Sequence, residues 1–352
     1  MRVEGLDTPA LVIELPRVQA NLKRAQAFAD KVGLELRPHI KTHKLPFFAK
    51  MQVEYGAAGI TCQKLGEAEV MADAGLADIF LPYNILGRDK LDRLAALHRR
   101  VAMSVTADSG ETLDGYAGRF TDTARPLPVL VECDTGGGRC GVQSPREALE
   151  LARRIAGAPG LRFDGLMTYP PRGKPAQVEA WLAEAVALLD ADGLTPGRVS
   201  NGGSPDYYRS DVVRSATEHR PGTYIYSDRM QVGYGHSTLE DCALTVLATV
   251  VSRPTADRAI LDAGSKALAA DRCDAGGHGH LVGYPDAVVA SLSEEHAVVD
   301  LSRCAARPRV GDKVRVVPNH ACVVSNLFDV ANLAVDGEIV ESLPILARGR
   351  MG

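Results

Sequence analysis

The sequence predicts an α/β fold that consists of a (β/α)8 TIM-type barrel and a second, mainly antiparallel β domain. Strand-like runs alternate with amphipathic helical runs as far as about residue 238, a pattern typical of parallel βαβ units. Eight strand-like runs occur in this repeat, and eight is the number that closes a barrel. Beyond residue 238, short strand-like runs and turns replace the helical periodicity.

The barrel is expected to span residues 15–238. A strand at residues 8–14 comes first, and Pro16 then opens a helix, because proline is tolerated at the first helical position. Helical runs such as residues 65–75 and 145–157 separate most of the later strands. The eight expected barrel strands are residues 34–41, 59–63, 78–85, 101–107, 128–134, 163–169, 197–203 and 222–226.

The second domain is expected to span residues 239–352 and to include the strand at residues 8–14. Its strand-like runs are short and lie close together in sequence, so antiparallel pairing is the simplest arrangement for them. We therefore expect the two ends of the chain to meet in one β domain.

Composition indicates which partners to expect. The chain has 352 residues, and its formal net charge of −4 offers no basic excess for binding phosphates of nucleic acid. A small metabolite is the expected partner. The sequence contains no apolar run of membrane-spanning length and no signal-peptide pattern, so no membrane partner and a cytoplasmic location are expected. The seven cysteines are widely spaced and odd in number, which indicates thiols.

Lys41 follows the first expected barrel strand, within the basic segment Arg37–Lys44. A lysine amine can form a Schiff base with a carbonyl cofactor when neighbouring cations and partial desolvation lower the amine pKa. His39, His43 and Lys44 are the neighbours that could supply this environment. The same segment also fits a basic loop on a solvated surface, because charged runs usually face water.

Two glycine-bearing turns follow or begin the last two expected strands. Active sites of such barrels lie at the carboxyl ends of the strands, and phosphate is often bound near the last two. Backbone N–H groups at Gly202, Gly203 and Ser204, and at the second turn, Gly222–Tyr224, could face such an anion. The alternative is a pair of tight turns that need glycine only for backbone freedom.

Arg139 lies in a glycine-rich segment, residues 134–141, after the fifth expected strand. A guanidinium fixed over the barrel mouth can hold a phenolate or carboxylate oxygen. Pairing of Arg139 with nearby Asp134 is the alternative. Tyr169, at the end of the sixth expected strand, also falls at the barrel mouth.

His320 and Cys322 form a possible metal-binding pair in the second domain. Side chains two residues apart point to the same face of an extended segment, so an imidazole and a thiolate there can share one metal. The remaining ligands would come from elsewhere, from water or from the substrate, which leaves the metal open for Lewis-acid chemistry. A buried pair without metal is the alternative.

Taken together, these segments resemble the D-threonine aldolase and D-serine dehydratase family, which has the fold of the alanine racemase group of pyridoxal phosphate enzymes. The resemblance covers nearly the whole chain. The matching segments are Asp7–Pro9, Arg37–Lys44, Cys62–Val70, Asp134–Val142, Asn201–Ser204, Glu218–Asp228, Leu261–Arg272, Leu292–Val299, Pro318–Leu327 and Ala347–Arg350.

The resemblance implies a role for each candidate residue. Lys41 would bind pyridoxal 5'-phosphate as a Schiff base and later act as a base near the substrate α-carbon, and Arg139 would contact the phenolic oxygen of the cofactor. His320 and Cys322 would bind a divalent metal that contacts the β-hydroxyl group of the substrate. Family members act as homodimers. The residues expected to bind the cofactor are Lys41, Arg139, Tyr169, Gly202, Gly203, Ser204, Gly222, Thr223 and Tyr224.

The expected activity is therefore that of a lyase that needs pyridoxal phosphate and zinc, manganese or magnesium. It would cleave 3-hydroxy-D-amino acids, with aldol cleavage to glycine and an aldehyde ahead of dehydration to ammonia and a 2-oxo acid. Amino-acid racemisation and a non-catalytic pyridoxal phosphate carrier are less favoured. A carrier would need neither a metal pair nor a β domain of this size.

Two departures from the family pattern bear on the choice of reaction. Family aldolases often have aspartate where this chain has Cys322, and a thiolate suits zinc better than manganese or magnesium, which favours dehydration. Family lyases also often have a histidine after the sixth strand, where this chain reads Tyr169-Pro170-Pro171-Arg172. An acid–base group would have to replace that histidine.

Overall fold

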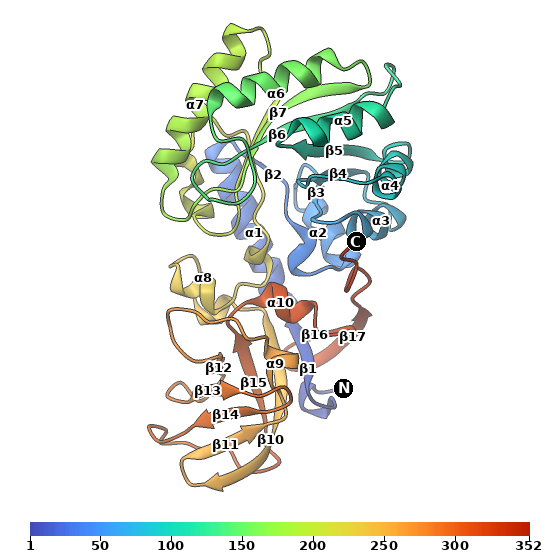
Figure 1. Cartoon of the computed structure of the whole chain (residues 1–352). Coiled ribbons are helices and arrows are strands. Elements are labelled where there is room, and N and C mark those ends of the chain that lie inside the picture. The colour runs from blue at the N-terminus through green and yellow to red at the C-terminus, as the bar shows by residue number, and fades with distance from the viewer. The chain divides into compact units, whose positions relative to one another are not determined.

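The computed structural model describes all 352 residues, which form two compact units. The barrel unit comprises residues 25–41, 46–222 and 350–352, and the β unit comprises residues 1–24, 42–45 and 223–349. The domain ranges expected from sequence, 15–238 and 239–352, stay a prediction about which segments fold together. Figure 1 traces the chain through both units.

The barrel unit is built on one sheet of eight parallel strands in the order β2-β9-β8-β7-β6-β5-β4-β3. An isolated parallel bridge between His39 and Thr61 connects the chain after β2 with β3, the two ends of this sheet. The predicted (β/α)8 TIM-type barrel is thereby confirmed. The strands are β2 Glu35–Leu36, β3 Ile60–Thr61, β4 Asp78–Leu81, β5 Ala102–Ala107, β6 Leu127–Cys133, β7 Leu161–Thr168, β8 Arg198–Asn201 and β9 Glu218–His219.

Helices alternate with these strands, and each helix from α3 to α7 packs against the next along the chain (Figure 1). Their ends follow local capping rules. The Ser144 hydroxyl, for example, accepts the Glu147 N–H at 3.2 Å, and Pro145 occupies the first position of α6. The helices are α1 Leu15–Val32, α2 Pro46–Glu54, α3 Leu65–Asp73, α4 Arg88–His98, α5 Gly110–Arg119, α6 Pro145–Gly157 and α7 Pro175–Ala191, with 3₁₀ helices η2 Ile40–Thr42 and η3 Tyr207–Val212.

The eighth barrel strand lies earlier than the sequence predicts. Its ladder residues are Glu218 and His219, which pair with β8 on one side and β2 on the other. The predicted strand at residues 222–226 is wrong, because Thr223–Ile225 form the 3₁₀ helix η4. Pro221 explains the difference, since a proline has no N–H to donate to a ladder.

Paired charges fill part of the barrel interior. The Arg37 guanidinium donates to Glu218 at 2.5 Å and to Asp78 at 2.7 Å. The Ser200 hydroxyl donates to the second Glu218 oxygen at 2.5 Å. Glu218 is fully buried, so these donors are what stabilises its charge inside the barrel.

The β unit contains a nine-stranded sheet whose pairings are antiparallel except for one. The exception is β1, which pairs in parallel with β16 and in antiparallel with β10. The mainly antiparallel second sheet is confirmed, and the strand expected at residues 8–14 belongs to it. Its strands are β1 Ala10–Glu14, β10 Leu244–Thr255, β11 Arg258–Leu261, β12 Gly279–Leu281, β13 Val288–Leu292, β14 Ala297–Asp300, β15 Lys313–Pro318, β16 Val330–Val335 and β17 Glu338–Pro344.

Short helices connect the strands of the β unit. They were not expected from the sequence, because runs of three to five residues carry no helical periodicity. They are η1 Val3–Gly5, η4 Thr223–Ile225, α8 Arg229–Gly233, η5 Leu239–Asp241, α9 Ser265–Leu268 and α10 Ala321–Ser325.

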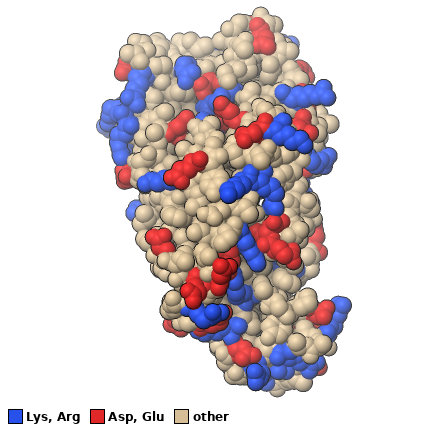
Figure 2. Space-filling view, turned by 180° about the vertical axis from the view of Figure 1, so that it is seen from behind, with Lys and Arg blue, Asp and Glu red and all other residues tan.

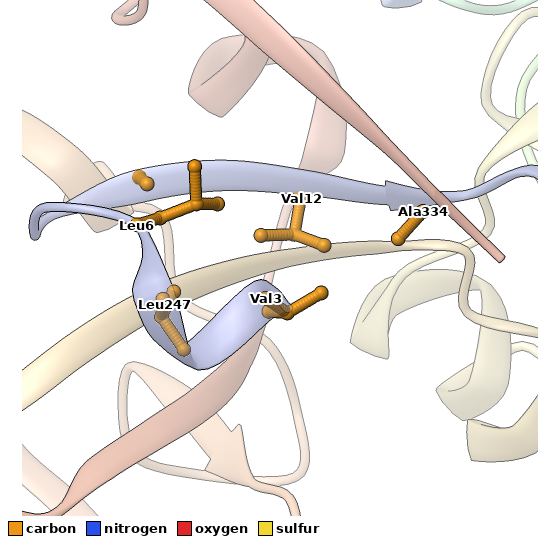
Figure 3. Close-up of a cluster of buried hydrophobic side chains, with 6 residues drawn as sticks. Val3, Leu6, Val12, Leu247 and Ala334 are labelled. Carbon is orange, nitrogen blue, oxygen red and sulfur yellow. The ribbon is translucent and has the colours of Figure 1, made fainter. Parts of the chain in front are cut away.

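The two ends of the chain share one hydrophobic cluster in the β unit (Figure 3). Val3 and Leu6 precede β1, and they pack with Val12 of β1, Leu247 of β10 and Ala334 of β16. Burial of these side chains fixes β1 between β10 and β16.

Basic and acidic side chains lie interspersed on the face shown in Figure 2. This mixing agrees with the small net charge of −4. Among the helices, none combines the length and the apolar character that a membrane crossing needs.

Candidate active site

Lys41 follows β2 and lies in η2, at the carboxyl end of the barrel strand. Its backbone N–H donates to His39 Nδ1 at 3.3 Å. An imidazole that accepts at Nδ1 carries its proton at Nε2, and His39 Nε2 lies 3.0 Å from Gln63 Oε1. The segment is therefore held by neighbours in the fold rather than extended into water.

The basic segment is buried, which contradicts its interpretation as a solvated loop. Arg37, His39, His43 and Lys44 are each at most 6% exposed. Only Lys41 keeps intermediate exposure among the basic residues of the segment. A lysine of intermediate exposure on an otherwise buried segment is an arrangement suited to binding a small carbonyl compound.

The turn after β8 brings Gly202, Gly203 and Ser204 together with Gly222. The Ser204 hydroxyl accepts the Gly222 N–H at 3.1 Å. Gly202 has a φ of +122°, and a Cβ there would lie 2.6 Å from His219 Nε2. A Cβ on Gly203 would lie 2.7 Å from Tyr169 Cε2. Close packing thus requires glycine at both positions, and at Gly202 the positive φ requires it as well.

Arg139 and Tyr169 are neighbours, since the guanidinium carbon lies 4.5 Å from the centre of the tyrosine ring. Asp134 has other partners: its carboxylate accepts the backbone N–H groups of Gly136, Gly137 and Gly138 at 2.6–3.1 Å. Burial alone would raise the pKa of Asp134, but these N–H donors outweigh burial and lower it. Asp134 therefore shapes the loop on which Arg139 is carried.

Sequence reasoning missed Arg220, a buried cation just after β9. Its guanidinium donates to the Ser200 hydroxyl at 2.8 Å and to the Thr168 carbonyl at 2.6 Å, and it makes no ion pair with a carboxylate. Burial lowers the pKa of Arg220 to about 10. Its position directly before the Pro221–Gly222 turn was the signal that could have identified it.

Glu132, near the end of β6, was also missed. Burial raises the pKa of its carboxyl to about 7, and the charges of Arg139 and Arg220 oppose that rise. The Thr106 hydroxyl lies 3.5 Å from Glu132 Oε2. Glu132 thus places a carboxyl that can change protonation near neutral pH within the electrostatic range of two site arginines.

In the β unit, His320 and Cys322 do not lie on an extended segment as the sequence predicts. His320 is the extended residue before α10, and Cys322 is the second residue of that helix. The reason is Asp228, whose buried carboxylate accepts the Ala321 N–H at 2.9 Å and caps the helix start. The two side chains nevertheless share a hydrogen bond.

The surroundings of this pair contain further polar atoms. His320 Nδ1 lies 3.2 Å from Asp271 Oδ1. Burial alone would lower the pKa of His320, but Cys322, Asp228 and Asp271 raise it to about 9.

Two hydroxyls hold the thiol of Cys322. Its sulfur lies 3.0 Å from Thr42 Oγ1 and 3.4 Å from Thr223 Oγ1. Thr223 and the neighbouring Tyr224 are both buried, in η4. The structure thus brings one residue of the expected phosphate turn, Thr223, next to one of the expected metal ligands.

Comparison with known proteins first defines the class. Residues 13–230 match the alanine racemase N-terminal domain, and residues 243–333 match the putative serine dehydratase domain. The parallel barrel with a mainly antiparallel second sheet is therefore of the alanine racemase type.

Two relatives, one of which also has a solved variant, narrow this class. The chain is 34% identical to D-threonine aldolase from an Arthrobacter species, covering 98% of this chain and 93% of the relative. It is 32% identical to D-threo-3-hydroxyaspartate dehydratase from Delftia strain HT23, covering 95% and 96%. A solved cysteine-to-alanine variant of that dehydratase, in the metal-free form, superposes with a TM-score of 0.90 at 29% identity, covering 98% of both chains.

The third relative is a solved structure, D-threonine aldolase from Filomicrobium marinum. It superposes with a TM-score of 0.91 at 30% identity and covers 100% of this chain and 98% of its own. The chain belongs to the D-threonine aldolase and D-serine dehydratase family, as the sequence motifs predict.

This family implies pyridoxal phosphate, and the barrel residues fit it. A phosphate ester needs backbone N–H donors on a turn free of obstructing side chains. Gly202 and Gly203 give the turn after β8 two successive residues without side chains, and a Cβ on either would collide with His219 or Tyr169. Arg220 adds a buried cation that makes no direct ion pair, although the charges of Glu218 and Glu132 act on it.

The family also implies a metal, and the donor set of His320 and Cys322 fits one. An imidazole and a thiolate are ordinary zinc ligands. No group of three or more His, Cys, Asp and Glu residues in this chain is arranged to hold a metal ion. A metal bound by the pair would therefore take its other ligands from water or from the substrate.

Proposed function

We propose that this chain is a pyridoxal phosphate- and divalent metal-dependent lyase that cleaves 3-hydroxy-D-amino acids to glycine and an aldehyde. The observation that carries the proposal is the 34% identity to a D-threonine aldolase over 98% of the chain. The positions of Lys41, of the two glycine turns and of the His320–Cys322 pair support it.

The barrel residues would bind and orient the cofactor. Lys41 would hold it through Nζ and, once the substrate amine has replaced Lys41, would take or return a proton near the substrate α-carbon. Gly202, Gly203 and Ser204 would donate backbone N–H groups to the phosphate, with Gly222, Thr223 and Tyr224. When bound, pyridoxal phosphate supplies an electron sink that stabilises negative charge at the α-carbon.

Arg139 and Tyr169 would complete the cofactor site. The Arg139 guanidinium would donate to the phenolic oxygen, and the Tyr169 ring stacked below it would hold the arginine in place. Stacking fixes a long side chain at low entropic cost, which is what a single oriented contact requires.

His320 and Cys322 would bind the metal. A divalent cation there supplies Lewis acidity to the hydroxyl group on the substrate β-carbon. The Thr42 and Thr223 hydroxyls would orient the Cys322 sulfur, as outer-shell hydrogen bonds do at other metal sites. Zinc, manganese and magnesium are all to be tested, and the thiolate favours zinc.

Dehydration of the same substrates is the second candidate. Cys322 favours it, because zinc bound by a thiolate is suited to assisting departure of hydroxide. The 32% identity to the Delftia dehydratase over 95% of this chain adds support.

Product identification separates the two reactions. Purified protein would be supplied with pyridoxal phosphate and each metal in turn, and then with D-threonine or 3-hydroxy-D-aspartate. Glycine with an aldehyde supports the aldolase, whereas ammonia with a 2-oxo acid identifies the dehydratase. Lys41→Ala should abolish both the products and the visible absorbance of the lysine-bound cofactor. An unchanged absorbance in Lys41→Ala would refute the role given to Lys41.

We also propose that the protein is a cytoplasmic homodimer. Its small-molecule partner would be a D-amino acid substrate. The family resemblance supports the dimer. Light scattering of the purified holoenzyme measures its mass directly, and a monomer mass of 37.5 kDa would refute the dimer.

A further inference from the structure

Three residues that line one small cavity of the barrel unit each carry a buried side-chain polar atom without a hydrogen-bond partner in the protein. These atoms are Asn201 Oδ1, Ser210 Oγ and His219 Nδ1. Unpaired buried polar atoms are rare in folded proteins because each loses its hydrogen bonds to water without gaining another partner. Three around one cavity therefore indicate a shared polar ligand.

The protonation of His219 follows from its other ring nitrogen. Nε2 lies 3.0 Å from the Gly203 carbonyl oxygen, so Nε2 must carry the proton and donate. The Gly203 N–H, 3.5 Å from the same nitrogen, cannot then be donating to it. Burial lowers the pKa of His219 to about 4, so the ring is neutral at neutral pH and Nδ1 is left as an acceptor.

The three atoms match the hydrogen-bonding capacity of one water molecule. Water donates twice, and His219 Nδ1 and Asn201 Oδ1 are both acceptors. Water also accepts, and the Ser210 hydroxyl is a donor. The cavity measures about 10 Å³, which is the room needed by the centre of one water.

We propose that a single buried water binds Asn201, Ser210 and His219, and that through His219 it positions the Gly203 carbonyl of the turn after β8. Asn201 and His219 are paired residues of neighbouring strands, so the water joins the ends of β8 and β9. His219 is a positioning residue rather than a catalytic one, since it acts through the turn.

The proposed water site and the hydrogen bond from His219 to the Gly203 carbonyl do not depend on a bound cofactor. Only their effect on cofactor affinity depends on the proposed function. The neutral ring also contacts the Tyr207 ring, with centroids 5.1 Å apart and planes tilted by 48°, and the Tyr207 hydroxyl donates to the Ala25 carbonyl at 2.6 Å. The imidazole is thereby held on both sides, which a mobile surface histidine would not be.

A crystal structure of the holoenzyme with ordered solvent tests the water. One water within hydrogen-bond distance of Asn201 Oδ1, Ser210 Oγ and His219 Nδ1 is the expected result. A dry cavity, or a direct hydrogen bond from Ser210 to His219, would overturn the proposal. ¹⁵N NMR of labelled protein adds a test in solution, because His219 should show an unprotonated Nδ1 and a protonated Nε2. The opposite tautomer would overturn it as well.

Two substitutions test the positioning role. His219→Leu removes the donor to Gly203 and should raise the dissociation constant of pyridoxal phosphate by about three- to tenfold, the effect of one hydrogen bond. His219→Gln retains a donor and should recover most of that affinity. Equal affinities for His219→Leu and the unchanged protein, or no recovery in His219→Gln, would overturn the role.

His98→Leu is the matched control. His98 is also buried, donates from Nε2 to a backbone carbonyl, that of Arg125 at 3.1 Å, and has an unpaired Nδ1. It ends α4, so its loss should leave cofactor affinity unchanged. If the protein binds no pyridoxal phosphate at all, the proposed function fails, and the solvent structure and tautomer still decide the water site.

Discussion

The side chains that hold Cys322 show how a single thiol is prepared for a metal. Thr42 and Thr223 approach its sulfur, and His320 shares a hydrogen bond with it. Cys304, a buried cysteine of the same unit, lies outside this pair, and burial raises its pKa. Replacing Cys322 and Cys304 in turn therefore separates loss of a metal ligand from loss of a buried thiol.

Cys322→Ala should lower turnover strongly, since loss of a metal ligand should cost at least the roughly 10–100-fold seen when outer-shell partners are removed. Cys304→Ala, in the same unit, should leave turnover near its original value. Turnover would be measured with each metal added back after chelation. Equal activities of the two variants would exclude Cys322 from metal binding.

His219 predicts how stability depends on pH. Its pKa is about 4 in the folded chain and about 6.5 when unfolded, so the unfolded chain binds the proton more readily. Stability is then complete above pH 6.5 and falls by up to about 3 kcal/mol as the pH drops to 4. Urea unfolding across this range should show a shallower fall for His219→Gln, whose side chain does not titrate. Identical slopes would contradict a neutral buried ring.

At this scale the sequence predicted only part of the site. Lys41, Gly202 and Cys322 occur in motifs, so their roles could be proposed before the structure was known. Arg220 and Glu132 could not be recognised in the same way, because a single charged residue beside a strand has no characteristic spacing. Only burial and neighbours in space distinguish them from surface charges.

At the scale of elements, the turn between β8 and η3 is tightly constrained by its neighbours. Gly203 packs against Tyr169 of the preceding strand end, and Gly202 packs against His219 of the following one. Side chains from both neighbouring strand ends therefore pack against the turn. The turn can adopt this shape because Gly202 and Gly203 have no side chains.

Gly203→Ala should weaken cofactor binding, because the new methyl group would lie 2.7 Å from Tyr169 Cε2 and displace either the ring or the turn. Cofactor affinity would be measured by titration of the apoprotein. Gly118→Ala is the control: no atom lies within 4 Å of its Cβ position in α5, so it should stabilise the helix by about 0.5–1 kcal/mol. Unchanged affinity in Gly203→Ala would remove the turn from the phosphate site.

Glu218 joins β9 to β2 through Arg37 as well as through the backbone. Glu218→Gln should cost about 3–5 kcal/mol in the free energy of unfolding, because it leaves buried Arg37 without its closest charge partner. Arg88→Gln, in an exposed pair 4.0 Å from Asp92, should change it by less than about 1 kcal/mol. Urea unfolding measures the free energy of unfolding of both variants. Similar decreases in the two variants would contradict the importance of burial for the Arg37–Glu218 pair.

The elements themselves were predicted where periodicity is strong. Seven barrel strands lie within or overlap their expected ranges, since alternation of strand and helix repeats along the chain. The eighth was misplaced because Pro221–Gly222 looks like the start of a strand in sequence, yet pairing ends two residues earlier. Helix α10 was missed because Asp228, the residue that caps it, is far away in sequence.

For the whole molecule, the places where the chain crosses between the two units are what the sequence could not reveal. The chain passes from one unit to the other within short segments, such as residues 42–45, that carry no change of composition. Fold class and family were accessible because both depend on long-range order of motifs rather than on any boundary.

Cofactor binding should stabilise the molecule as a whole. A ligand at about 100 times its dissociation constant adds about 2.7 kcal/mol to the free energy of unfolding. Pyridoxal phosphate should therefore raise the melting temperature of the apoprotein, and Lys41→Ala should lose most of that gain while the melting temperature of its apoprotein stays close to the original. Calorimetry with and without cofactor measures this, and an equal gain in both proteins would contradict covalent attachment at Lys41.

Strand β1 is made well before the two strands that pair with it, β10 and β16. Leu11 pairs with Val246 on one edge and with Ala331 on the other, some three hundred residues later. Contacts this distant in sequence form slowly, because closing a long loop costs chain entropy before the contacts can stabilise the fold. Until β10 and β16 have been made, β1 is therefore an apolar strand with both edges unpaired. A chaperone that recognises such strands would be able to bind β1 during this time.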